Sequence, residues 1–374
     1  MKNTAHHRSR RPGLAAGFSL VEIMVGLVIG MLAVIVVLQV FSLSESQKRT
    51  TTGGGDAQSS GAIALYQLQN DIGQAGYGVA STMLFNCNIK WKIASGASIA
   101  TAVPLAPVTI NPATNIVPAG DPNTDTILLM YGNTNGEPQG NTIISPGTTV
   151  NTMQMPGAFA KNDYVIDAPS SCGATNLMIN QISADPTPTT VTLKTADVAD
   201  GAALYNLGTA PVILAYAVRK GNLTVCDYTA NDCGLAANKD DVSVWVPVAS
   251  NIVSLKAQYA RDTSTPMDAI ADLYDGTTPS GAAANCGWAR ISAVRLALVA
   301  RSTQYEKDTV TANAPEWSGT TADNPAGSAS NPIDLSKNPD GTDNTLWQRY
   351  RYKLFETNVP IRNVVWMGVL SECS

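Results

Sequence analysis

The stretch GFSLVEIMVGLVIGMLAVIVVLQVF, residues 17–41, decides the fold of this chain of 374 residues. With a rise of ~1.5 Å per residue, a helix from Phe18 to Phe41 would be ~36 Å long, enough to cross a bilayer core of ~30 Å. One carboxylate, that of Glu22, lies near the start of this apolar run. A charge at the centre of a membrane helix costs ~2.5–3.5 kcal/mol, and a charge near its end still needs a partner. The stretch therefore predicts a membrane helix whose glutamate has a specific role.

The segment before this helix is basic, because residues 1–17 hold Lys2, Arg8, Arg10 and Arg11 and no acid. A basic leader marks the side of the membrane that stays in the cytoplasm. A cleaved secretory signal would have a shorter apolar core followed by a small-residue cleavage site. A plain signal anchor would fit the length and charge, but it would have no use for Glu22.

The motif G-F-S-L-V-E, between the basic leader and the apolar run, resembles the class III signal of type IV pilins and type II secretion pseudopilins. The resemblance implies that a prepilin peptidase removes residues 1–17 by cutting between Gly17 and Phe18, and that the new N-terminus at Phe18 is N-methylated. It also implies that Glu22 faces the Phe18 amine of a neighbouring subunit. A buried ion pair of this kind is a device for register, since either charge alone would be penalised.

Residues 42–80 predict an amphipathic helical region that follows the transmembrane and assembly helix at 18–41. Within it we expect a break at Gly53–Gly55, because each glycine costs ~1 kcal/mol relative to alanine in a helix interior. Helical periodicity resumes beyond the glycines. The apolar stripe of this second part consists of Ile63, Leu65, Tyr66, Leu68 and Ile72.

Residues 81–374 predict a β-rich head, because short runs with many β-branched residues alternate with clusters of Pro, Gly, Asn and Asp. The expected strands lie at 126–132, 163–168, 177–183, 190–195, 210–220, 242–248, 252–260 and 291–302. Residues 303–346 are polar and weakly patterned, which predicts a long surface loop, and the end of the chain reads as a strand. The predicted fold is α+β and pilin-like, with a long N-terminal helix packed on an antiparallel β-sheet head.

Two further stretches narrow the resemblance to the PilW family of minor pilins. NDIGQAGYG (70–78) is similar to the end of that family's long helix, and ISAVRLALVARS and YRYKLFETNVPIRN are similar to its two C-terminal strands. The pattern in the last strand is carried here by Arg351, Phe355, Val359, Arg362 and Asn363. Phe355 also fits the role of an ordinary core residue.

Membership of this family implies a minor pilin that joins a priming or tip complex in type IV pilus assembly. The implied partners are the prepilin peptidase, other minor pilins, the major pilin and a tip adhesin. The head would face the periplasm before the subunit enters the pilus. A J-type minor pseudopilin of a type II secretion system shares the architecture. A membrane-anchored periplasmic binding or adhesin domain is the alternative from another class.

Six cysteines follow the apolar segment, and their even number in an exported head predicts up to three disulfides. Cys226 and Cys233, separated by DYTAND, would close one small loop. The pairing of the others is left open by the sequence, and free buried thiols are the alternative. These others are Cys87, Cys172, Cys286 and Cys373.

The sequence offers little catalytic chemistry. Its two histidines, His6 and His7, lie in the leader, so the mature chain would have no histidine base. We predict no enzymatic activity, no catalytic residues and no cofactor. The chain carries a net charge of −5, and removing the +4 of the leader leaves about −9, which disfavours nucleic-acid binding.

Two polar turns are candidates for binding calcium. Asp121, Asn123 and Asp125 in DPNTD have the spacing that sets oxygens around a hard cation, and NPDGTDN (338–344) is similar. Asp and Asn also cluster in turns for backbone reasons alone. Near the long loop, Trp317 and Trp347 would serve either partner contacts or the anchoring of the loop.

Overall fold

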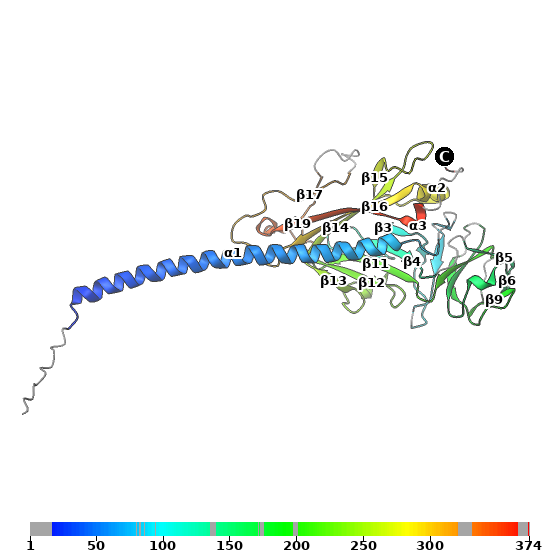
Figure 1. Cartoon of the computed structure of the whole chain (residues 1–374), viewed down its shortest axis with the longest axis horizontal. Coiled ribbons are helices and arrows are strands. Elements are labelled where there is room, and N and C mark those ends of the chain that lie inside the picture. Colours follow the sequence, from blue (N-terminus) through cyan, green and yellow to red (C-terminus); the bar gives the residue numbers. More distant parts are fainter. Residues whose placement is uncertain are drawn as a thin grey trace, which may run out of the picture. The chain divides into compact units, whose positions relative to one another are not determined.

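A computed structural model describes residues 17–79, 81, 84–85, 87–93, 95–134, 140–170, 172, 176–196, 201–320, 331–365 and 373. The chain divides into two compact units, Met1–Thr52 and Gly53–Ser374. The first unit holds the apolar part of the long helix, and the second holds the head together with the rest of that helix (Figure 1).

Helix α1, Leu20–Gln74, is α-helical through the glycine run, so the break expected at Gly53–Gly55 is wrong. The reason lies in packing within the second unit. Gly53 and Ala57 are buried, and a Cβ atom on Gly53 would lie 3.1 Å from the Cβ of Ser302. Tertiary contacts of this kind outweigh the poor helix propensity of glycine.

The second half of α1 packs against two antiparallel sheets of the head (Figure 1). The five-stranded sheet has the order β13-β12-β11-β4-β3, with β3 Val108–Ile110, β4 Ile127–Tyr131, β11 Val212–Arg219, β12 Asn222–Asp227 and β13 Val246–Ser250. The four-stranded sheet has the order β15-β14-β16-β19, with β14 Ile252–Arg261, β15 Leu273–Asp275, β16 Ile291–Arg301 and β19 Tyr352–Pro360. The main core contains Ala64, Leu68 and Ile72 of α1 together with buried side chains of both sheets.

A further group of strands forms a small barrel. The eight-stranded ladder has the order β2-β1-β8-β7-β10-β5-β6-β9, with β1 Asn88–Lys90, β2 Val103–Pro104, β5 Asn141–Ser145, β6 Val150–Met153, β7 Tyr164–Ala168, β8 Leu177–Gln181, β9 Thr190–Thr192 and β10 Ala203–Gly208. A bridge between Ile182 and Leu193 joins the end of β8 to the end of β9, which closes the ring from β8 through β7, β10, β5 and β6 to β9. The barrel has its own core, which includes Ile143, Val165 and Leu204.

The remaining elements are short. They are the helices α2 Ala284–Ala289 and α3 Arg362–Val365, the strands β17 Glu316–Trp317 and β18 Asn331–Pro332, and 3-10 turns at Pro156–Ala158, Ala236–Asn238, Gly281–Ala283 and Trp347–Arg349. Strands β17 and β18 pair with each other and are the regular ladder within residues 303–346 that the structure describes. The chain after β19 turns into α3, so the strand predicted for its end is too long.

The predicted α+β, pilin-like fold is confirmed, and the expected strands correspond to β4, β7, β8, β9, β11, β13, β14 and β16. The strand expected at 242–248 starts later, at Val246. Asp241 caps a turn there, with its carboxylate accepting hydrogen bonds from the backbone N–H (2.8 Å) and hydroxyl (2.7 Å) of Ser243. This side-chain capping competes with strand pairing.

Candidate functional site

The predicted cleavage and assembly residues lie at the start of α1. Gly17 and Phe18 are exposed and precede the helix, and residues 1–16 of the leader lie outside the described part. Ser19 stands at the N-cap position, where its hydroxyl accepts a hydrogen bond from the backbone N–H of Val21 (3.3 Å). Glu22, in the first turn, accepts one from the backbone N–H of Ser19 (3.3 Å). Ser19 and Glu22 therefore form a variant of the capping box, in which the serine hydroxyl accepts from the second helical N–H instead of the third, at the positive end of the helix dipole.

The spacing S-x-x-E is the signal in the sequence that indicates this cap, in addition to the role of Glu22 as a charge that needs a partner. The apolar run of α1 is long enough to span a membrane: its best window has a mean hydropathy of 2.9, and none of that window is buried within the protein. One described helix is thus a candidate membrane anchor that begins with a carboxylate in its first turn.

The second half of α1 is fixed to the head by a buried polar cluster that sequence reasoning missed. Asp71 accepts hydrogen bonds from Gln67 of its own helix (3.0 Å), from the hydroxyl of Tyr131 on β4 (3.0 Å) and from the hydroxyl of Tyr216 on β11. Burial, followed by the charge of Asp71 and the hydrogen bond to it, raises the pKa of both tyrosines. The hydroxyls therefore stay protonated and act as donors that fix the helix on the five-stranded sheet.

The residues of the C-terminal pattern also attach α1 to the head. The ring of Phe355 on β19 lies against Gly61, where any added Cβ would overlap with it. Val359 is buried in the main core. The side-chain amide of Asn363 donates hydrogen bonds to the carbonyl oxygens of Gln74 and Ala75, both at 3.0 Å, and thereby caps the C-terminal end of α1.

The two arginines of that pattern lie at the surface. Arg351 pairs with Glu306 through Nε and Oε1 at 3.3 Å, and Arg362 is exposed at the start of α3. Three members of the pattern therefore hold the long helix on the sheet, and the arginines flank them. Such roles explain the spacing of the pattern without any contact to a ligand.

All six cysteines are paired in the structure. Cys226 and Cys233 form the small-loop disulfide expected from their spacing. The four cysteines whose pairing the sequence left open form Cys87–Cys172 and Cys286–Cys373, with sequence separations of 85 and 87. Cys286–Cys373 joins α2 to the C-terminal end of the chain, where Arg290 also donates to the carbonyl oxygen of Cys373 (2.8 Å).

The two calcium candidates lie beside each other, but their oxygens serve other partners. Asp121 accepts hydrogen bonds from the backbone N–H groups of Lys220 (2.8 Å) and Gly221 (2.7 Å). Burial raises the pKa of Asp121, although these two hydrogen bonds act to lower it. Asp125 accepts the side-chain amide of Asn111 (3.0 Å) and the backbone N–H of Ala257 (2.9 Å). Asn123 donates to Asp334 (2.8 Å), so it does not join the other two around a common point.

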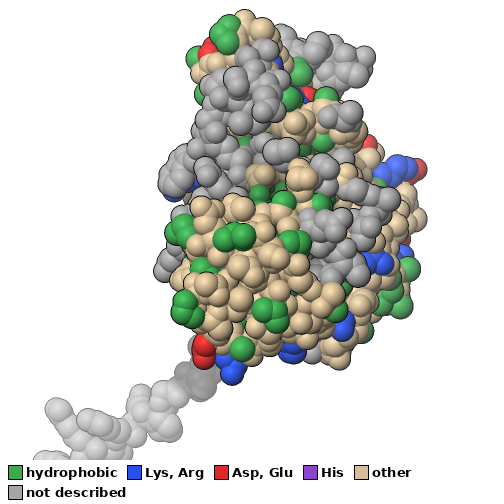
Figure 2. All heavy atoms as spheres, turned by 90° about the vertical axis from the view of Figure 1, so that its right-hand side faces the viewer, with side chains coloured by type: hydrophobic (Ala, Val, Ile, Leu, Met, Phe, Trp, Pro, Cys, Tyr) green, Lys and Arg blue, Asp and Glu red, His purple; other side chains and the backbone are tan. Residues whose placement is uncertain are grey.

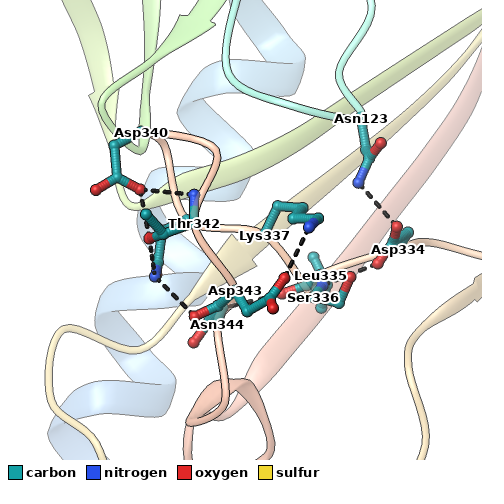
Figure 3. Close-up of polar contacts among 10 residues, drawn as sticks. Asn123, Asp334, Leu335, Ser336, Lys337, Asp340, Thr342, Asp343 and Asn344 are labelled. Carbon is teal, nitrogen blue, oxygen red and sulfur yellow. Dashed lines mark hydrogen bonds and ion pairs between the residues drawn. The ribbon is translucent and has the colours of Figure 1, made fainter.

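Residues of the second turn are also held by internal bonds, as Figure 3 shows. Asp340 accepts the backbone N–H (3.0 Å) and hydroxyl (2.6 Å) of Thr342, which lowers its pKa, and Asp343 pairs with Lys337 at 2.7 Å. Within the described residues no group of three or more histidine, cysteine, aspartate or glutamate side chains is arranged to hold a metal. The interpretation as turn chemistry accounts for both segments.

The two tryptophans beside the long loop serve as anchors. Trp317 is buried in a small cluster with Val299, Ile333 and Leu335, and the half-buried Trp347 packs against the same cluster. The backbone of Trp347 also accepts a hydrogen bond from the hydroxyl of Tyr352 (2.9 Å).

A long N-terminal helix that starts in an apolar run and docks on antiparallel sheets defines a protein of the pilin-like class. Residues 216–363 match the PilW family, described as Type IV Pilus-assembly protein W. The predicted resemblance to PilW is thereby confirmed over the part of the head from β11 to α3, and the protein is related to type IV pilus assembly. No curated protein and no solved structure matches the chain.

Proposed function

We propose that this chain is a minor pilin that is cut between Gly17 and Phe18, N-methylated at Phe18 and built into a complex that initiates a type IV pilus. The observation that carries the proposal is the pairing of a class III signal at the start of α1 with a PilW match in the head. The subunit would sit in the inner membrane with its head in the periplasm and would then move to the pilus tip. Its partners would be the prepilin peptidase, the major pilin, other minor pilins and a tip adhesin.

The proposed role is assembly and not catalysis. In the isolated chain Glu22 serves the capping box with Ser19. In the filament its carboxylate would exchange this backbone N–H for the methylated amine of a neighbouring Phe18, which carries a full positive charge. A carboxylate in hydrocarbon is stabilised far more by an ammonium group than by a neutral amide. The exchange would therefore favour docking over remaining alone in lipid.

The test compares Glu22→Ala with Ser19→Ala in cells, with surface piliation and the amount of membrane-bound protein as readouts. Ser19→Ala removes the cap and keeps the carboxylate, so it separates the two roles of the motif. We expect Glu22→Ala to lose most piliation at unchanged protein level and Ser19→Ala to keep it. Equal piliation in both variants would contradict the assembly role.

Processing is tested separately by mass spectrometry of the mature N-terminus. A methylated Phe18 is the expected result, and an intact Met1 in membrane fractions would contradict cleavage. A J-type pseudopilin would give the same N-terminus, so piliation is the readout that distinguishes a pilus subunit from a secretion subunit. A membrane-anchored binding domain that never polymerises would tolerate Glu22→Ala.

A further inference from the structure

The small barrel is an insertion into one connection of the five-stranded sheet. Strands β4 and β11 are direct antiparallel neighbours, with Tyr131 opposite Val212 and Ile127 opposite Tyr216. Neighbours of this kind are ordinarily joined by a short turn. Here the connection contains β5 to β10 and their barrel core, and all of it lies before residue 216, where the PilW match begins. The barrel therefore lies outside the matched part of the head, and segments inserted into a connection of this kind commonly carry function.

The face of the barrel formed by β5, β6 and β9 lies on the right-hand side of Figure 1. Seen from that side in Figure 2, its described surface shows few charged side chains and several separate hydrophobic ones. Ile144, Val150 and Met155 are among the exposed apolar residues of this part of the chain. A surface of this composition has no basic footprint for nucleic acid.

A cavity among the described residues lies where the barrel meets the five-stranded sheet. Its volume is about 630 Å³, within the range of ~300–1,000 Å³ typical of ligand sites. Tyr164 of β7 and Gln181 of β8 line it from the barrel, Val212 and Asp227 line it from β11 and β12, and Trp91 follows β1. The cavity thus exists only because the insertion stands beside β11.

The lining combines apolar side chains with side chains that can form hydrogen bonds. Trp91 is buried and held in place, because its indole N–H donates to the carbonyl oxygen of Tyr228 (2.9 Å) and its ring meets the Tyr228 ring edge-on. The half-buried Tyr164 and Met178 add to the apolar part of the lining. Its polar part includes hydroxyl, amide and charged side chains, among them Gln181, whose side-chain oxygen accepts a hydrogen bond from Lys194 (3.1 Å).

An added β-strand from a peptide does not suit this cavity. The backbone carbonyl of Gln181 already accepts the N–H of Lys194 (2.7 Å). The side chain of Asn180 accepts the backbone N–H of Thr195 (3.2 Å) and donates to its carbonyl oxygen (2.7 Å). The hydrogen-bonding groups of Asn180 and Gln181 that an added strand would use are therefore already paired within the protein.

We propose that this cavity binds a short oligosaccharide. The C–H face of a sugar ring packs on aromatic and aliphatic side chains, while its hydroxyls exchange hydrogen bonds with amides, hydroxyls and ions. The charged lining residues are two cations, Lys92 and Lys194, and one carboxylate, Asp227. Two cations against one anion predict tighter binding of an oligosaccharide that carries carboxylates, such as a uronic-acid trimer, than of a neutral one.

The experiment titrates the full chain in lipid nanodiscs with an oligogalacturonate trimer, maltotriose and chitotriose, followed by saturation-transfer NMR and calorimetry. Thr209 is an exposed residue at the cavity, so Thr209→Trp fills the site without changing the core. Thr142 is exposed on β5, away from the lining, and Thr142→Trp is the matched control. We expect Thr209→Trp to weaken binding at least tenfold and Thr142→Trp to leave it unchanged.

A third variant, Lys194→Gln, tests whether the positive charge of the cavity lining favours acidic sugars. It should lower the preference for the uronate over maltotriose several-fold while keeping the neutral sugars bound. The proposal is overturned if none of the three sugars binds the unmodified chain, or if Thr209→Trp binds as well as the control. Because the assay contains no filament, its outcome is independent of whether the chain assembles into a pilus.

Discussion

The Oδ1 atom of Asp71 on α1 accepts a 3.0 Å hydrogen bond from the hydroxyl of Tyr131 on β4, inside the core of the head. The other carboxylate oxygen accepts from Tyr216 and Gln67. A charge that is only 5% exposed is thus surrounded by three donors, all from residues that line the junction of helix and sheet. Satisfied networks of this kind fix one arrangement of two elements, and they are costly to break.

We predict that Asp71→Leu lowers the free energy of unfolding of the head by ~2–5 kcal/mol, because it leaves two buried hydroxyls without their acceptor. Asp71→Asn keeps an acceptor oxygen and should cost less. Denaturant unfolding of the full chain in detergent, followed by tryptophan fluorescence, measures both. In a double-mutant cycle, Tyr131→Phe and Tyr216→Phe should be non-additive. A loss below 1 kcal/mol for Asp71→Leu would contradict the role of the network.

The buried tyrosines predict a loss of stability at alkaline pH. Burial raises the pKa of Tyr259 to about 12 from an ordinary value of 10.0. Burial also raises the pKa values of Tyr131, Tyr205, Tyr216, Tyr228 and Tyr352. Above pH 10 the unfolded chain loses protons that the folded chain keeps, so stability is fully present below about pH 10 and falls as the pH rises further.

The measurement is the midpoint of denaturant unfolding between pH 8.5 and 11.5. Above pH 10 the free energy of unfolding should fall more steeply with pH, by up to ~1.4 kcal/mol per pH unit for each fully buried tyrosine. Tyr259→Phe should be less stable at pH 8.5 but should show a shallower decline. An identical decline in that variant would show that Tyr259 does not contribute.

The elements that depend on a local sequence pattern could be predicted from the sequence. Residues 17–41 predicted the apolar helix, and alternating β-branched runs located eight strands. The barrel could not be foreseen, because it depends on the bridge between Ile182 and Leu193 and on the pairing of β5 with β10, which are far apart in the chain. The Asp71 cluster could not be foreseen either, since its two tyrosines come from strands that are neighbours in the sheet but far apart in the sequence. The glycine run was misjudged because helix propensity is local, whereas the burial of Gly53 is not.

Two glycines of α1 should respond in opposite ways to the same substitution. A Cβ on Gly55 would have no atom within 4 Å, so Gly55→Ala should stabilise the helix by ~0.5–1 kcal/mol. A Cβ on Gly61 would overlap with the ring of Phe355, so Gly61→Ala should destabilise the head. Unfolding of both variants in detergent measures the difference. Adding Phe355→Leu should recover part of the loss in Gly61→Ala, and an unchanged loss would show that the clash is not its cause.

The cap at the end of α1 gives a prediction for the PilW-like pattern itself. Asn363 donates to two carbonyl oxygens at the negative end of the helix dipole. Asn363→Ala should cost ~1–2 kcal/mol through the lost bonds, whereas Asn363→Asp should cost more, because a carboxylate would face these carbonyls without a donor. Arg362→Gln, at the exposed neighbouring position, is the control and should stay within ~0.5 kcal/mol. If Asn363→Asp is as stable as Asn363→Ala, the side-chain amide of Asn363 does not act as the cap of α1.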